Sequence, residues 1–195
     1  DITPTVSVED KFLLFSFQQE WVQENRRQPG TAWKYWEEVA QNWYAGARDA
    51  WGEVRIGNVA ARYEGAQFVL APLLEMLEPD LVEAMDFYFK NGSTVITTAD
   101  LGRLDYENNV LRDAPLECLR RWGIEVPELE LLALQQEAEV IGEIEEEKIS
   151  GHIFWAVPLA SISDEIVTIG KTAEGLPMAL AFPVKKGKIV IAMTA

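Results

Sequence analysis

A polar segment at residues 97–109 holds the densest set of side chains that could do chemistry in this 195-residue chain. It contains three carboxylates and a guanidinium, those of Asp100, Asp105, Glu107 and Arg103. Carboxylates could bind a hard cation or act as a general acid and base. Their spacing matches no standard calcium loop, and no partner group for acid–base catalysis can be identified. We therefore favour the interpretation that Asp and Asn side chains hold this loop through backbone hydrogen bonds.

The sequence offers few other groups for catalysis. Its one cysteine, Cys118, excludes an intrachain disulfide and a cysteine-based zinc site. Its one histidine, His152, leaves almost nothing from which a Ser-His-Asp triad could be built. A nucleophile elbow needs Ser or Cys in a tight turn after a strand, whereas Ala99 and Asp100 follow Thr98. The glycines are too scattered for a phosphate-binding loop. We expect no catalytic residue, no metal and no cofactor in this chain.

The charge of the chain argues against two classes of partner. The formal net charge is −15 and the sequence pI is about 4.5. Such a surface repels phosphate backbones and anionic lipid head groups, so we expect neither nucleic acid nor membrane as a partner.

The chain begins at Asp1 without a methionine or a signal-peptide pattern, which indicates an excised or processed piece. The expected location is the cytoplasm.

The elements that must position the polar segment alternate between strand and helix. Strands are predicted at residues 11–17, 54–56, 67–71 and 93–98, and helices at 31–51, 79–91 and 113–122. Such alternation with short loops is typical of an α/β fold, a parallel sheet covered by helices. Ligands of such sheets bind at the carboxyl ends of the strands, where the predicted loops are 18–28, 72–78 and 99–112.

The pattern changes after Gly123. Further strands are predicted at 138–144, 152–158, 164–169, 176–183 and 188–194, with a hairpin over residues 182–190. This β-rich part could extend the sheet or fold over it. We therefore divide the chain into an α/β core at 1–126 and a β-rich C-terminal extension of the same domain at 127–195.

Seven tryptophans are a high number for this length. Four lie on the predicted helix at 31–51, where spacings of three and four residues favour a core face that docks the helix on the sheet. Trp21 instead lies in the predicted loop 18–28. It could pack in the core, contact a partner subunit or stack on a sugar.

Several of these segments together resemble a known family. Residues 68–77, 91–98 and 102–108 are similar to the trimerisation domain of glycoside hydrolase family 42 β-galactosidases, whose order is strand, apolar–Pro–apolar turn, helix, strand and polar loop. Residues 113–126 resemble its Pro-Leu-Arg-Asp-Leu-Leu-Gly-Ile-x-Val segment. The resemblance covers residues 10–126 well and the remainder loosely. Asn91-Gly92-Ser93 replaces the usual double glycine, and Tyr106 stands where an acidic residue is common.

The resemblance implies a flavodoxin-like or class I glutamine-amidotransferase-like sheet that lacks the amidotransferase nucleophile. In the family, this domain follows a catalytic (β/α)8 barrel and helps to assemble a trimer. The barrel carries both catalytic glutamates, so none is transferred to this chain. We expect a non-catalytic trimerisation domain whose partners are other copies of itself and a barrel, with carbohydrate as a third candidate. The candidate interface or binding residues are Trp21, Asp100, Arg103, Asp105 and Glu107.

Two alternatives belong to other functional classes. The first is a stand-alone hydrolase on the amidotransferase-like sheet, using Asp100, Asp105 or Glu107. The second is a carbohydrate-binding domain that uses exposed tryptophans.

Overall fold

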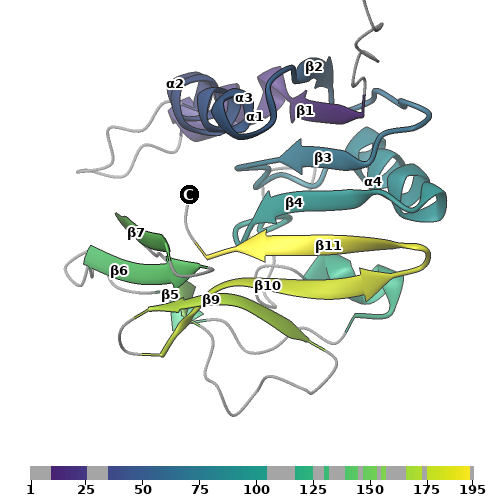
Figure 1. Ribbon diagram of the computed structural model, residues 1–195. Helices are drawn as coiled ribbons and strands as arrows, with labels where there is room; N and C mark the ends of the chain where they lie inside the picture. The colour runs from purple at the N-terminus through teal and green to yellow at the C-terminus, as the bar shows by residue number, and fades with distance from the viewer. Residues whose placement is uncertain are drawn as a thin grey trace, which may run out of the picture.

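One large mixed sheet organises the molecule in this computed structural model, which describes residues 10–25, 35–104, 117–124, 130–131, 139–144, 147–152, 155–156, 166–172 and 175–193. Its strands follow the order β2-β1-β3-β4-β11-β10-β9-β6-β7 (Figure 1). The first five run parallel, and the others pair antiparallel. Their bounds in this order are Arg55–Asn58, Lys11–Phe15, Phe68–Ala71, Thr94–Thr98, Gly187–Ala192, Pro177–Val184, Val167–Thr172, Glu139–Ile144 and Glu147–His152. The predicted α/β class is confirmed, and strands of the β-rich part extend the sheet.

The last strand of the chain lies inside this sheet. β11 pairs in parallel with β4, with Ile189 beside Val95, and antiparallel with β10 through the predicted hairpin. A separate two-stranded sheet joins β5 (Glu130–Leu131) to β8 (Trp155–Ala156). The carboxyl ends of β1, β3, β4 and β11 consequently meet at one edge.

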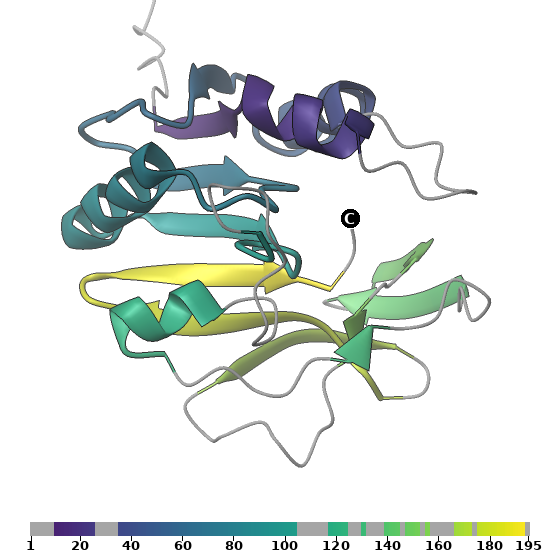
Figure 2. The same ribbon diagram turned by 180° about the vertical axis from the view of Figure 1, so that it is seen from behind.

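Helix α4 (Pro79–Asn91) follows the prediction closely because its boundary signals are local. Pro79 starts the first turn, and Gly92 ends the helix with a left-handed φ of 87°. The apolar side of α4 packs on one face of the sheet (Figure 2), where Tyr88 and Phe89 are fully buried. The 3-10 helix η2 (Glu117–Trp122) lies beside it, with the Trp122 ring 5.2 Å from that of Phe89.

The segment predicted as the loop 18–28 is instead largely helix α1 (Phe17–Asn25), so the prediction that Trp21 lies in a loop is wrong. Ser16 explains the start of this helix, because its hydroxyl accepts hydrogen bonds from the backbone N–H groups of Gln18 and Gln19. The helix is mainly polar and buries Gln19 and Val22, so it lacks the apolar stripe by which a helix is recognised from sequence.

The predicted helix at 31–51 contains a change of helical type. It is described as α2 (Tyr35–Glu38), the π-helical segment η1 (Val39–Tyr44) and α3 (Ala45–Trp51). A π-helical turn holds more residues than an α-turn, so positions on either side of it do not share one face. Trp43 and Trp51 pack against the core as predicted, whereas Trp36 is 50% exposed and that prediction is wrong. Trp33 lies outside the described residues.

Helices cover the two faces of the sheet unequally. Gly187 of β11 faces α4, because a Cβ added there would lie 3.3 Å from the Cα of Phe89. Ile189 and Ile191 share that side by strand alternation and are fully buried. On the opposite side, Trp51 of α3 packs against Phe68 of β3, with ring centroids 5.3 Å apart.

Candidate functional site

Buried polar side chains gather where β1 and β3 end. Ser16 directly follows β1, and its hydroxyl donates to Oε1 of Glu78 at 2.5 Å. The backbone N–H of Ser16 donates to the hydroxyl of Tyr35 at 3.2 Å. Ser16 and Glu78 are almost completely buried. Burial raises the pKa of Tyr35, and the nearby charges of Glu78 and Asp100 raise it further, so the hydroxyl remains protonated at neutral pH.

Gln19 joins helix α1 to the segment before α4. Its Nε2 donates to the carbonyl oxygen of Met76 at 2.7 Å, and its Oε1 accepts from the N–H of Met76 at 2.9 Å. Nε2 also lies 3.4 Å from Oε1 of Glu78. Because both polar atoms of Gln19 are hydrogen-bonded to the backbone of Met76 or to Glu78, the arrangement is suited to fixing α1 in place.

The turn after β4 has the position of a nucleophile elbow but not its geometry. The hydroxyl of Thr98 accepts the N–H of Leu73 at 2.9 Å and donates to Asp100. Leu73, after β3, has a left-handed φ of 54°, and the left-handed residue in the turn after β4 is Gly102, with a φ of 69°. Both Leu73 and Ala99 carry buried apolar side chains. Neither position could therefore attack a substrate.

The turn after β4 is tied to the segment after β3. Arg103 pairs with Glu75 at 2.6 Å, and the backbone N–H groups of Gly102 and Leu104 donate to the carbonyls of Leu74 and Glu75. Burial raises the pKa of Asp100 to about 6, with a further increase from the charge of Glu75. The hydrogen bond from Thr98 and the charge of Arg103 oppose this increase. The groups on residues 99–104 thus hold the turn against the segment after β3.

The predicted site residues separate into two places. Asp100 and Arg103 lie in one turn, where each interacts with Glu75, whereas Trp21 lies on α1 and is 64% exposed. Asp105 and Glu107 lie outside the described residues. Sequence reasoning missed four buried or half-buried polar residues at this edge, Ser16, Gln19, Glu75 and Glu78. Glu78 precedes Pro79, and this position could have identified it, whereas Ser16 fell inside the strand predicted at 11–17.

Three exposed aromatic side chains form a second feature at the end of β1. Phe17, Trp21 and Trp36 are exposed by 72%, 64% and 50%, and we call them the aromatic surface. The ring of Phe15 connects two of them, since its centroid lies 5.0 Å from that of Phe17 and 5.3 Å from that of Trp36. Trp21 lies one helical turn after Phe17. Exposed aromatic groups of this kind are typical of protein interfaces.

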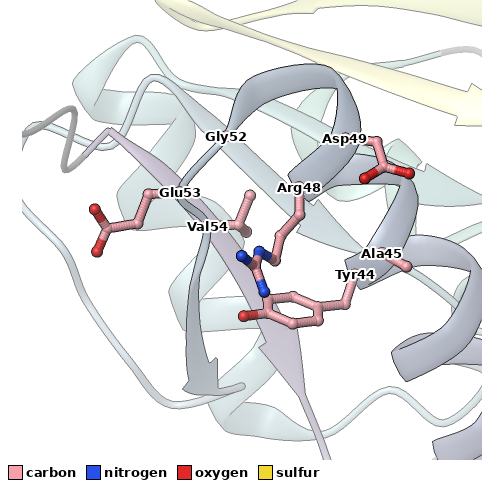
Figure 3. A pocket seen from close by; sticks show the side chains of 7 residues that line it. All are labelled: Tyr44, Ala45, Arg48, Asp49, Gly52, Glu53 and Val54. Carbon is pink, nitrogen blue, oxygen red and sulfur yellow. The ribbon is translucent and has the colours of Figure 1, made fainter.

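A hollow of about 740 Å³ beside α3 offers no alternative site for catalysis (Figure 3). Its charged side chains are those of Arg48, Asp49 and Glu53. The guanidinium of Arg48 lies over the ring of Tyr44, 5.8 Å from its centroid, while Asp49 and Glu53 point away from it. The charged groups do not converge on a common point.

The described residues contain neither a metal-binding cluster nor a membrane-spanning helix. Across them, no group of three or more His, Cys, Asp or Glu side chains could hold a metal ion. None of the helices described has the length and apolar character needed to span a bilayer.

Comparisons with known proteins place this geometry in a family. The family model described as the β-galactosidase trimerisation domain matches residues 11–192. No curated protein matches the chain. Among solved structures, the GH42 β-galactosidase Gan42B from G. stearothermophilus matches with a TM-score of 0.74 and 14% identity, over 95% of this chain and 27% of its own.

Two other solved β-galactosidases agree with this result. The enzyme from Bacillus circulans sp. alkalophilus gives a TM-score of 0.74 at 15% identity, covering 94% of this chain and 28% of its own. The enzyme from Rahnella sp. R3 gives a TM-score of 0.70 at 18% identity, covering 95% of this chain and 28% of its own. The chain therefore spans little more than a quarter of these relatives. Because the family model matches nearly the whole chain and the fold agrees, the chain belongs to the β-galactosidase trimerisation domain family.

Proposed function

We propose that this chain joins the subunits of a larger β-galactosidase-like glycoside hydrolase, and that its aromatic surface contacts another subunit. The observation that carries the proposal is the exposure of Phe17, Trp21 and Trp36 on neighbouring helices of a trimerisation domain. A catalytic (β/α)8 barrel elsewhere in the parent protein is part of the proposal, as is a cytoplasmic location. The turn carrying Asp100 and Arg103 would support this surface from the same edge of the sheet.

The buried polar groups at the carboxyl edge support this division of roles. Gln19 and Ser16 fix the start of α1 through hydrogen bonds to Met76 and Glu78. Rigid presentation of aromatic groups reduces the entropy lost on association. The edge of the sheet that holds ligands in other α/β proteins would here position a contact surface.

Sedimentation equilibrium of the chain, over a range of concentrations, tests the proposal. The expected mass is three times 22.0 kDa. Replacing Trp21 with alanine should weaken association by about 30-fold or more, because buried interface tryptophans commonly contribute about 2 kcal/mol. The matched control is Ile56→Ala on β2, an apolar side chain that is 48% exposed and is not a member of the aromatic surface. A monomer at every concentration would contradict the proposal.

Carbohydrate binding is a second candidate because two of the three exposed aromatic residues are tryptophans, Trp21 and Trp36. Tryptophan fluorescence titrated with a panel of galactosides distinguishes the two roles. A saturable change that Trp21→Ala abolishes, in a chain that stays monomeric, would favour sugar binding. Unchanged fluorescence in a chain that forms trimers would favour subunit contact.

A further inference from the structure

The strands β4, β11, β10 and β9 have one face that turns away from α4. On β11 the side chains of Val190 and Ala192 alternate with Ile189 and Ile191, which face α4. The register places Ile96 beside Val190, Ala181 across from Val190, and Val167 across from Ala181. Side chains in such pairs share a face. We call this the open face, and its apolar members are Ile96, Val167, Ile169, Ala179, Ala181, Val190 and Ala192.

No helix in the described part of the chain lies over these strands on that side (Figure 1). Trp51 of α3 packs against Phe68 of β3. Helix α3 therefore lies over β3 and not over the four strands of the open face. Val167 is 60% exposed, and the other apolar members are partly exposed. Parallel strands such as β4 and β11 normally have both faces covered, and an exposed apolar patch of this kind is typical of an interaction surface.

Symmetry restricts how three copies can meet, and this step rests on the proposed function. A ring of three identical subunits cannot be built from a surface that contacts itself, because each subunit must offer two different surfaces. The aromatic surface supplies one of them. The open face is apolar, lies on other elements, and could supply the second.

The charges of the two surfaces are complementary. Helices α1 and α2 contain four glutamates and no lysine or arginine, and Glu20 and Glu37 stand next to Trp21 and Trp36. The four strands of the open face contain Lys171 and Lys188 but no Asp or Glu. Glu143 of β6 lies opposite Lys171 in the register, so Lys188 is the main charge of the open face. In a chain of net charge −15, this is a place where another acidic copy meets little repulsion.

We infer that the aromatic surface of one copy packs on the open face of the next, with its glutamates toward the Lys188 side. Aromatic rings would cover the aliphatic strands, and the charges would set the direction of the contact. Each copy would then donate one surface and receive the other.

Two variants that each destroy one surface test this inference. Val167→Glu places a charge on the open face, and Trp21→Glu places one on the aromatic surface. Both positions are exposed, so each variant should remain folded and unfold cooperatively in urea, at a midpoint below that of wild type only by the stability that association adds. Ile56→Glu is the matched control, at an exposed apolar position on β2 outside both surfaces. Sedimentation equilibrium should give monomers for the first two variants and a trimer for the control.

Mixing the two variants gives the decisive result. Each retains the surface that the other has lost, so the mixture should form a 1:1 complex of twice 22.0 kDa that cannot grow further. A wild-type trimer with an equally stable Val167→Glu trimer would overturn the inference and leave the proposed function intact. A mixture that stays monomeric would also overturn it. A wild-type chain that stays monomeric at every concentration would contradict the proposed function itself.

Discussion

Gln19 shows how a single buried amide can determine the position of a helix. Replacing it with methionine keeps the volume but leaves the N–H and carbonyl of Met76 without their partners. We expect the free energy of unfolding to fall by about 2–3 kcal/mol, since each unsatisfied buried group is costly. Urea unfolding measures the change. Gln18→Met is the control, because that neighbouring side chain is exposed and should change stability by less than about 0.5 kcal/mol.

Asp100 makes stability depend on pH in a direction opposite to that of most carboxylates. Its pKa is raised to about 6 in the folded protein from an ordinary value of 3.8. Between these values the folded state binds more protons than the unfolded state, so stability falls as the pH rises from about 4 to about 6. Asp100→Asn keeps an acceptor for the Thr98 hydroxyl and removes the charge. The variant should be the more stable by about 1–2 kcal/mol at pH 7.5.

The difference between Asp100→Asn and wild type should disappear below about pH 3, where the wild-type carboxyl is protonated in both the folded and the unfolded state. Urea unfolding of the two proteins at several pH values measures this. A difference that is constant with pH would show that Asp100 does not titrate in this range.

At the scale of elements, the surroundings of Gly187 and Gly46 predict opposite effects on stability when each is replaced with alanine. A Cβ at Gly187, in the first position of β11, would lie 2.2 Å from the carbonyl oxygen of Ser93. Gly187→Ala should therefore destabilise by about 2–3 kcal/mol, because the backbone of Ser93 must move. Gly46 in α3 is exposed and has no atom within 4 Å of such a Cβ. Gly46→Ala should stabilise by about 0.5–1 kcal/mol through helix propensity.

Thermal unfolding of both glycine variants tests the placement of β11 against β4. A Gly187→Ala protein with the wild-type midpoint would contradict the close approach of β11 to the end of α4. The same approach explains why β4 and β11, far apart in the sequence, are neighbours in the sheet.

At the scale of the whole molecule, the end of the chain completes the core. β11 lies between β4 and β10, and Ile189, Ile191 and Met193 are fully buried. A chain truncated after residue 175 should lose cooperative urea unfolding, since it exposes the edge of β4 and the side of α4 that packs on β11. Near-UV circular dichroism measures the loss of fixed aromatic packing. The control is Lys186→Ala in the β10–β11 turn, which should unfold as cooperatively as wild type.

Features that depend on neighbouring residues could be predicted from the amino-acid sequence. Pro79 and Gly92 set the two ends of α4 through their backbone conformations, and the β-branched run that ends at Thr98 predicts β4. The α/β class followed from the order of such local patterns along the chain, and the family followed from the resemblance of those segments to its members. The absence of Ser or Cys after Thr98 and the charge of −15 also followed from the sequence.

Contacts between distant residues could not be predicted and became visible in the folded chain. The tertiary structure brought Glu75 to Arg103, joined Gln19 to Met76, and inserted β11 beside β4. It also separated Trp36, which is exposed, from Trp43 and Trp51, which pack on the core. The physical reason is that propensity and periodicity report on residues within a few turns of one another. Burial, strand order and ion pairs instead depend on packing between segments many residues apart, which no local pattern contains.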